Sequence, residues 1–397
     1  MKKFIKGLDW YLFFPYLLLC GIGIVMVYSA SAGIGLTHGG FAPDYLVKQA
    51  AFVGISLLLL VLVYRMRFAV FQKPFFLGIL EITLLVLLVY VKFFGTKVNG
   101  AAGWLSLGFI KLQPAELCKF YFIIYFANMF NKRSRLITQE GILRATFHNF
   151  TPLIVPALCL LLILFQPDTG GFAINLFIIL VMFLAASTAS KLVPWIVGLV
   201  LILPLFLIHI GSGVIAHFVS NSQNYKLQRF VSFADPFLHA QTSGQQLINS
   251  YYAISNGGIF GRGLGNSIQK MGYLAEPNTD FILPIISEEL GLVGVVLILA
   301  LLCILIVRTI DIGFRTTNLY FSSVCYGTAA YLTIQTLFNA GGAVGFVPLT
   351  GVTLPFISYG GSSMITLSLC LGLVMKISSK ERQLSSQRQP GIQIPRQ

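Results

Sequence analysis

Asp280 is the acidic residue whose position most strongly suggests chemistry. It lies in Thr279-Asp280-Phe281-Ile282, where a long polar segment ends and an apolar run begins. Ionisable groups are costly near the membrane interior and are retained there mainly for function, and a carboxylate is a common general acid or base. Because Asn278 or Thr279 can cap the following helix, we favour a functional role for Asp280 over a capping role.

Glu116 and Lys119 form a second candidate pair. They are three residues apart, after Pro114, which suits the first turn of a helix. Side chains at this spacing share one helix face and can form an ion pair. A structural ion pair and a role in ligand binding are equally compatible with the sequence.

Four further acidic residues lie close to apolar runs. Asp168, before Thr-Gly-Gly, is typical of a turn and a helix N-cap. Glu288 follows Asp280 by eight residues, which is a rotation of about 80° on a helix, whereas Glu289 points elsewhere. The two glutamates are equally suited to packing and inter-helix hydrogen bonds, and we assign no role to Glu81.

Metal and disulfide chemistry are not indicated. The six cysteines and five histidines show no zinc-binding or paired-cysteine spacing. We interpret the cysteines as small buried apolar residues.

The elements that must position these residues are membrane-spanning helices. Of the 397 residues, 56% are hydrophobic and only 10% are charged, against about 25% charged in soluble domains. The apolar residues form long runs, and about 20 such residues cross a bilayer as a helix. We therefore predict an all-α polytopic membrane protein of about ten spans, near residues 11–30, 49–64, 75–94, 114–130, 151–166, 170–187, 192–210, 281–307, 318–337 and 356–376.

Charge distribution gives the expected orientation. The net charge is +14, and most of the 27 basic residues fall in segments that are cytoplasmic if the N-terminus is cytoplasmic. This bias explains the charge without nucleic-acid binding. We expect one membrane-embedded domain over 1–377 and a disordered cytoplasmic tail over 378–397, with both termini on the same side.

One long segment, 211–280, is expected on the outer face between the seventh and eighth spans. Loops of this length usually carry function. It contains three cations that could face a ligand, Arg229, Arg262 and Lys270, and a glycine-rich stretch over 256–265. As a group, these glycines indicate backbone packed closely beside a ligand or another helix.

Two motifs, taken together, resemble the SEDS family of bacterial cell-wall glycosyltransferases (shape, elongation, division and sporulation proteins). The first is 279–282 followed by Glu288-Glu289-Leu290-Gly291, and the second is the run from Leu354 to Ser363. The stretches 263–270 and 351–355 are most similar to the cell-division branch of that family. Ala275 and Gly103 depart from the family pattern, and Gly103 replaces an arginine often found before the tryptophan equivalent to Trp104.

The resemblance implies polymerisation of lipid II into glycan strands on the outer face of the bacterial plasma membrane, at the division septum. It also implies a class B penicillin-binding protein (a transpeptidase) and other divisome proteins as partners. The alternatives are an elongation-type polymerase, a lipid II flippase and a division scaffold without activity. The absence of an inverted repeat and the one-sided polar residues favour an enzyme over a transporter.

We expect Asp280 to act as the general base for the acceptor hydroxyl, with undecaprenyl pyrophosphate as the leaving group. Lys119, Arg229, Arg262 and Lys270 are the candidates for stabilising the pyrophosphate. Glu116 and Ser358 complete the predicted substrate-binding set. No cofactor is required by the sequence, although Mg²⁺ or Mn²⁺ could assist the leaving group.

Overall fold

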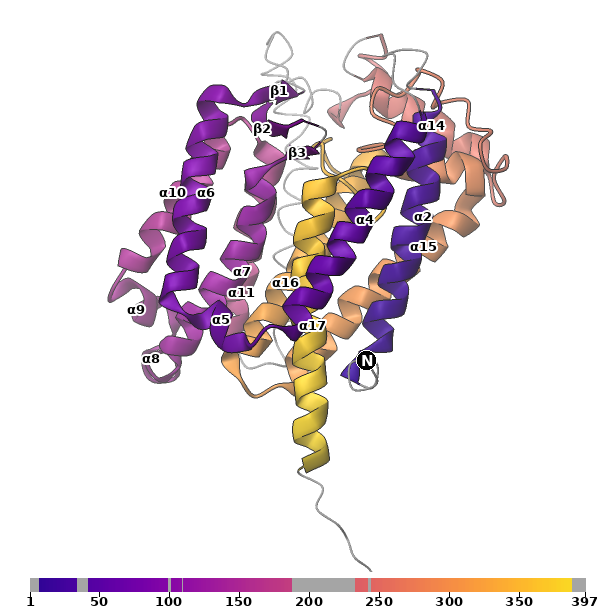
Figure 1. Ribbon diagram of the computed structural model, residues 1–397. Coiled ribbons are helices and arrows are strands. Elements are labelled where there is room, and N and C mark those ends of the chain that lie inside the picture. The colour runs from indigo at the N-terminus through magenta and orange to yellow at the C-terminus, as the bar shows by residue number, and fades with distance from the viewer. Residues whose placement is uncertain are drawn as a thin grey trace, which may run out of the picture.

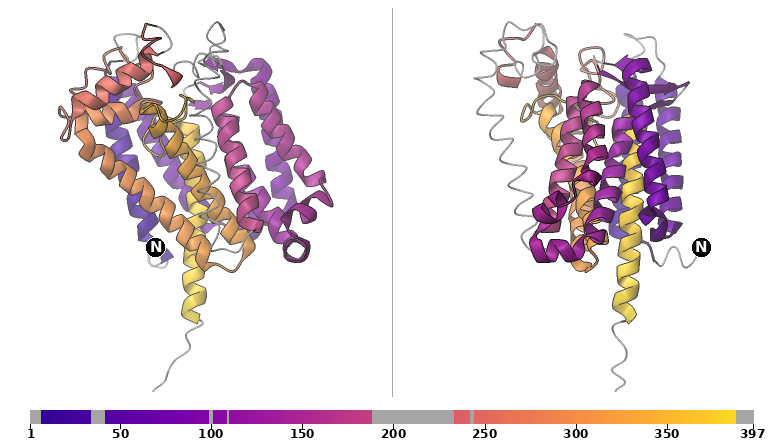
Figure 2. Two further views of the ribbon diagram at one scale, coloured as in Figure 1. Left: turned by 180° about the vertical axis from the view of Figure 1, so that it is seen from behind. Right: turned by 90° about the vertical axis from the view of Figure 1, so that its left-hand side faces the viewer.

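The protein is a bundle of long helices. A computed structural model describes residues 7–33, 42–98, 101–108, 110–187, 233–241 and 244–387. Most helices in this part run along a common direction, as Figures 1 and 2 show from three sides. Six of the described helices are long and apolar enough to cross a membrane. The prediction of a multi-pass helical membrane protein is therefore confirmed.

A helix lies at each predicted span except 192–210, which is outside the described residues, so the count of ten stays a prediction. The long helices are α2 (Trp10–Ser31), α4 (Ala42–Arg65), α6 (Pro74–Phe94), α7 (Pro114–Lys132), α10 (Ile154–Phe165), α11 (Thr169–Ser187), α14 (Gln245–Gly257), α15 (Ile282–Arg315), α16 (Leu319–Ala343) and α17 (Gly361–Gln387). Short helices connect some of them, namely α5 (Phe68–Gln72), α8 (Ser134–Glu140), α9 (Ile142–Phe147) and the 3₁₀ turn η1 (Thr151–Leu153).

A small β-sheet, which the sequence did not predict, corrects the expectation of an all-α fold. Strands β1 (Thr96–Val98), β2 (Ala101–Leu107) and β3 (Ile110–Leu112) pair in that order, and both pairings are antiparallel. Trp104 lies in β2 opposite Thr96. Strands β1 and β3 have three residues each, which is too short to show an alternating apolar pattern, and β2 begins with Ala-Ala-Gly, so the signal in the sequence was weak.

The helices connect two distinct ends of the bundle. One end carries the β-sheet and α14, and we call it the sheet end (Figure 1). The other carries α5, α8, α9 and the last turns of α17, and we call it the tail end. Between them, α7 and α16 are buried along most of their length, with α11 and α17 packed against both.

Helix α15 is broken near its start at the sheet end. Gly291 has φ +70°, which a helix does not allow, and two backbone carbonyls lose their helical partners there. The loop after α14 replaces them, because the N–H of Arg262 donates to Glu288 O at 2.9 Å and the N–H of Gly263 donates to Glu289 O at 3.0 Å. The loop and the broken helix therefore form one hydrogen-bonded unit.

Glycines make this contact possible. A Cβ atom at Gly257 would lie 1.8 Å from Ser287 O, and one at Gly261 would lie 2.2 Å from Glu289 O. No side chain fits at either distance, so close approach of the two backbones requires glycine. The expectation that this stretch packs against another helix is confirmed.

Asp9 joins three helices at the tail end. It is fully buried and its Oδ2 accepts hydrogen bonds from Arg308 of α15 at 2.8 Å and from Ser378 of α17 at 2.6 Å. Arg382 of α17 also contacts it at 2.5 Å. Because these contacts favour the helical form, α17 continues to Gln387, ten residues into the segment where we expected a disordered tail.

Burial acts to raise the pKa of Asp9, but hydrogen bonds from Arg308, Ser378 and Arg382 outweigh it and hold the pKa below its ordinary value. A carboxyl with a lowered pKa stabilises the fold above its unfolded pKa of about 3.9, and loses that contribution only as the pH falls through the folded value. Between pH 5 and 8 its contribution is therefore constant.

We predict that Asp9→Asn lowers the free energy of unfolding by about 1–3 kcal/mol, because hydrogen bonds to a charged group are lost. Thermal unfolding of the purified protein in detergent should show the same loss at pH 5 and pH 8. Asp311→Asn is the control. Asp311 also contacts Arg308 but is 33% exposed, so its loss should be smaller. A loss for Asp9→Asn that vanishes at pH 5 would contradict the assignment.

Candidate active site at the sheet end

Asp280 lies in the turn directly before α15, at the sheet end, and is half-buried. The helix cap is Phe281, which makes no side-chain capping hydrogen bond. The prediction that Asn278 or Thr279 caps this helix is therefore wrong. Their side chains bind elsewhere, with Asn278 donating to Ser31 Oγ at 3.0 Å and Thr279 donating to Glu276 Oε2 at 3.2 Å.

The backbone around Asp280 is held at three consecutive carbonyls. The carbonyl of Asn278 accepts from the N–H of Tyr359 at 2.8 Å. The carbonyl of Thr279 accepts from Ser358 Oγ at 2.6 Å, and the carbonyl of Asp280 accepts from Asn339 Nδ2 at 2.9 Å. Ser358 is thus brought next to Asp280, with its hydroxyl bonded to backbone groups, and its role in substrate binding stays a prediction.

The loop that supplies Ser358 connects α16 to α17 and is strained. Phe356 has φ +63°, a region that non-glycine residues occupy only when the surroundings enforce it. Its ring lies edge-on to Tyr16 of α2, with 5.0 Å between ring centroids. At Gly23 of α2, a Cβ would lie 2.6 Å from Phe356 O. Helix α2 therefore braces the loop that holds Asp280.

Lys270 is buried and fully engaged with protein groups. Its ammonium donates to Glu289 Oε1 at 2.6 Å, to Gly265 O at 2.8 Å and to Ser29 Oγ at 3.0 Å. The side chains of Lys270 and Glu289 are 1% and 0% exposed. An ammonium has three donors, and all three are used here, which argues against Lys270 as a direct phosphate ligand.

Glu288 is satisfied by the loop after α14. Its carboxylate accepts from Ser267 Oγ at 2.5 Å, from the N–H of Gln269 at 3.1 Å and from Asn256 Nδ2 at 3.2 Å. Glu288 and Glu289 therefore bind the loop to the broken helix from opposite sides. This matches the inter-helix hydrogen bonding that the sequence left open for the pair.

The predicted pairing of Glu116 with Lys119 is confirmed. Glu116 Oε1 lies 2.5 Å from Lys119 Nζ, and Tyr331 Oη of α16 donates to Glu116 Oε2 at 2.8 Å. Lys119 is 0% exposed, whereas Glu116 keeps 14% exposure. The ammonium also lies 4.7 Å from the centre of the Tyr331 ring, a favourable cation–π distance.

Asp168 caps α11, as predicted, and lies near this pair. It accepts from the N–H of Gly171 at 2.7 Å and from Gln113 Nε2 at 2.8 Å. Burial raises the pKa of Asp168, and the charge of Glu116 raises it further, while the hydrogen bond from Gly171 and the charge of Lys119 lower it. The pKa of Asp168 therefore lies above its ordinary value, and the charge of Glu116 contributes to this shift.

The remaining predicted site residues are less constrained. Arg262 is exposed, and its backbone rather than its guanidinium joins α15. Arg229 lies outside the described residues. Within the described ranges, no three His, Cys, Asp or Glu side chains are placed to hold a metal ion.

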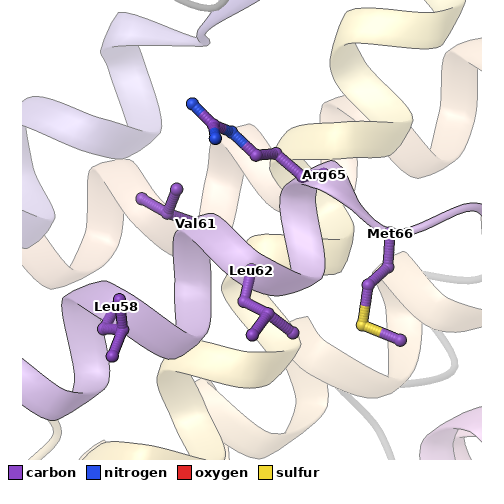
Figure 3. Close-up of a pocket in the computed structure, with 5 residues that line it drawn as sticks. All are labelled: Leu58, Val61, Leu62, Arg65 and Met66. Atoms are coloured by element: carbon purple, nitrogen blue, oxygen red, sulfur yellow. The ribbon is translucent and has the colours of Figure 1, made fainter.

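A shallow apolar groove lies elsewhere, on the last turns of α4 toward the tail end. Leu58, Val61, Leu62, Arg65 and Met66 line it, as the close-up in Figure 3 shows. Its lining has no general acid or base, because the guanidinium of Arg65 stays protonated and the other side chains are apolar. It does not belong to the site around Asp280.

No role was predicted from the sequence for Asn339 or Tyr331. Both are on α16 and both contact a predicted acidic residue. In sequence they lie within an ordinary apolar helix pattern, and only their polarity at buried positions could have indicated them.

Known proteins resemble this chain over nearly its whole length. Residues 10–383 match the family model of FtsW, RodA and SpoVE, described as cell cycle proteins. The chain is 37% identical over 396 residues to the probable peptidoglycan glycosyltransferase FtsW of Lactococcus lactis subsp. lactis (strain IL1403), covering 94% of this chain and 93% of that protein. It is 37% identical over 385 residues to the protein of the same name in Bacillus subtilis (strain 168), covering 95% and 92%.

Among solved structures, one chain of a peptidoglycan synthase complex that coordinates polymerization and crosslinking superposes with a TM-score of 0.67. The two chains are 28% identical, and the alignment covers 95% of this chain and 99% of that one. The fold and the sequence therefore agree, and this chain belongs to the FtsW/RodA/SpoVE family, the SEDS family that its motifs resemble.

Proposed function

We propose that this protein is a peptidoglycan glycosyltransferase of the cell-division type, which polymerises lipid II into glycan strands at the septum. The observation that carries the proposal is Asp280, a half-buried carboxylate at one end of a membrane bundle, where helix α16 and the loop between α16 and α17 hold the backbone of residues 278–280. Relatives named as probable peptidoglycan glycosyltransferases, aligned over more than nine-tenths of the chain, support it.

The sheet end is proposed to face outward. Basic residues concentrate at the tail end, and the cytoplasmic side of a membrane protein carries this excess. They belong to the ends of α4, α7, α15 and α17 and to the adjacent short helices, and include Arg65, Arg67, Lys73, Lys132, Arg133, Arg135, Arg144, Arg308, Arg315, Lys380 and Arg382. The sugars and pyrophosphate of an outward-facing lipid II would then lie at the level of Asp280.

In the proposed reaction, Asp280 removes the proton from the sugar 4-hydroxyl of the acceptor. That oxygen forms a bond to the anomeric carbon of the donor, and the bond from this carbon to the pyrophosphate oxygen breaks. The proton remains on Asp280, and undecaprenyl pyrophosphate leaves with the electron pair. The step needs a carboxylate within hydrogen-bond reach of the acceptor and positive charge near the leaving group.

Among the predicted cations, the exposed guanidinium of Arg262 suits the pyrophosphate best, and Arg229 remains proposed for the same role. Lys119 and Lys270 are each buried in an ion pair, so we propose that they support the site from within the bundle. Glu116 keeps some exposure and remains a proposed substrate contact. No step is routed through a metal ion.

The alternatives are less well supported. A flippase must carry polar groups through the bundle, whereas Asp280, Glu288, Glu116 and Asp168 all lie near helix starts at the sheet end. An elongation-type polymerase would share the same chemistry, but the relatives from Lactococcus lactis and Bacillus subtilis, each 37% identical, carry the name FtsW.

A class B penicillin-binding protein, which crosslinks strands, is the proposed partner within the divisome, because the similar solved chain comes from a complex that combines polymerization and crosslinking. Co-purification of the two proteins from detergent-solubilised membranes tests this assignment.

We predict that Asp280→Asn lowers the rate of polymerisation by about 10²–10⁴-fold, the usual contribution of a general base. The amide keeps the size of the side chain and leaves the hydrogen bonds to the flanking carbonyls intact, so expression and thermal stability should match the wild type. Strand synthesis from purified lipid II measures the rate. Asp235→Asn, a change at an exposed acid earlier in the same segment, is the control. Near-normal synthesis by Asp280→Asn would remove Asp280 from the mechanism.

We predict that Lys119→Met destabilises the protein by about 3–5 kcal/mol, because the Glu116 carboxylate loses its partner in a buried setting. The double variant Glu116→Gln/Lys119→Met should regain most of that stability, since no unpaired charge remains. Thermal unfolding in detergent measures both. If Lys119→Met were as stable as the wild type, the ion pair would have no structural role, and a stable but inactive double variant would place the pair at the substrate.

The proposed orientation predicts which positions react with a membrane-impermeant thiol reagent. Arg262→Cys should be labelled in intact cells, because it is exposed at the sheet end, whereas Arg135→Cys in α8 should be labelled only after lysis. Five native cysteines are buried and Cys303 lies in mid-helix on α15, so the background should be low. Labelling of Arg135→Cys from outside would reverse the orientation.

A further inference from the structure

We infer that Asn339 and Ser358 are positioning residues for Asp280, which fix its backbone without touching substrate. The inference rests on the proposed function of Asp280 as the general base. Neither residue needs to change protonation or contact a sugar. Their role is to set the direction in which the Asp280 side chain leaves the main chain.

The two residues pin the peptide planes on both sides of Asp280. The carbonyl of Thr279 belongs to the plane before its Cα, and Ser358 Oγ donates to that carbonyl at 2.6 Å. The carbonyl of Asp280 belongs to the plane after its Cα, and Asn339 Nδ2 donates to it at 2.9 Å. Because peptide units are rigid, fixing both planes fixes φ and ψ of Asp280 and therefore the direction of its Cα–Cβ bond.

Asn339 is buried, and its amide group donates only to backbone carbonyls among the described residues. It is 3% exposed, and its Nδ2 group makes a second hydrogen bond to Val352 O at 2.8 Å. Both partners are carbonyl oxygens, which can only accept, so the orientation of the amide is determined. Its Oδ1 is buried with no donor among the described residues. A buried amide oxygen without a donor is unfavourable, so an asparagine at this position indicates that its two donated hydrogen bonds, to Asp280 O and Val352 O, are important.

Ser358 links Asp280 to the strained loop. Its Oγ accepts from the N–H of Leu354 at 2.8 Å while donating to Thr279 O. The bond between Leu354 and Ser358 closes the loop around Phe356, which lies between these two residues in sequence and has a φ of +63°. The Ser358 hydroxyl therefore connects Thr279, the residue before Asp280, to a loop that α2 holds in place.

Catalysis is sensitive to this support, because a misplacement of about 1 Å at a reacting group can lower a rate about 10²-fold. Loss of either bond should lower kcat by roughly 10–100-fold with little change in KM, since substrate binding does not use these groups. Ser358→Thr, which keeps the hydroxyl, should retain most of the activity that Ser358→Ala loses.

The experiment compares Asn339→Ala, Ser358→Ala and Ser358→Thr in the full chain with its transpeptidase partner, measuring kcat and KM for lipid II. Gln335→Ala is the matched control. Gln335 is a buried amide one turn earlier on α16, which donates to Thr353 O at 2.9 Å and Ser363 Oγ at 2.8 Å but to none of the 278–280 carbonyls. It should lose stability with kcat largely kept.

In the Asp280→Asn background, Asn339→Ala should lower the residual rate no further, because the group that it positions is already absent. A kcat within about twofold of wild type for Asn339→Ala and Ser358→Ala, or an equal loss of kcat for Gln335→Ala, overturns the inference. If Asn339→Ala fails to fold, the contrast between Ser358→Ala and Ser358→Thr decides. Loss of the proposed function is distinguishable, because then the wild type itself makes no strands.

Discussion

Backbone groups that leave a helix inside a membrane protein must find hydrogen-bond partners within the protein, since lipid offers none. Around Asp280, the described residues leave regular helix at the turn before α15, at the break at Gly291 and in the loop between α16 and α17. Other parts of the protein supply hydrogen-bond partners for the turn and for the break. Tyr359 and Ser358 of the loop hold the turn, and the segment after α14 holds the break.

The position of Asp280 follows from this constraint. A helix that simply began at the membrane surface would leave its first residues free to move. Here the turn is held by α2 through Asn278, by α16 through Asn339 and by the strained loop through Ser358. The carboxylate is therefore attached to the rigid part of the bundle while remaining half-buried at its end.

The buried charges serve the same end. Two lysines that were predicted from the sequence to bind the pyrophosphate are each paired with a glutamate, Lys119 with Glu116 and Lys270 with Glu289. A buried ion pair adds little net stability, but breaking one is costly, so such pairs fix a single arrangement of the elements that carry them. The Glu116–Lys119 pair lies within α7, and Tyr331 of α16 also donates to Glu116, whereas the Lys270–Glu289 pair joins the loop after α14 to the broken helix.

Much of this architecture could be predicted because its signals are local. Apolar runs of membrane length gave the helices, the three-residue spacing gave the Glu116–Lys119 pair, and the turn chemistry of Asp168 gave a helix cap. The failures have non-local causes. The extension of α17 depends on Asp9, which lies 369 residues away from Ser378 in the sequence.

The pairing of Lys270 with Glu289 and the contact of Asn339 with Asp280 likewise join separate elements. No pattern in a single segment specifies them. The small β-sheet was missed for another reason, because two of its strands have only three residues and the third begins with Ala-Ala-Gly, which gives no clear periodicity. The positions of the acids and the contact within one helix, Glu116 with Lys119, were therefore predictable, whereas the contacts between separate elements were not.

The most direct test of the proposed function is the product formed from purified lipid II by the purified chain together with the proposed transpeptidase partner. The account predicts long glycan strands that a muramidase degrades, with one undecaprenyl pyrophosphate released for each disaccharide added. If lipid II instead crossed the bilayer of reconstituted vesicles and remained unpolymerised, the chain would be a transporter and the account would be contradicted.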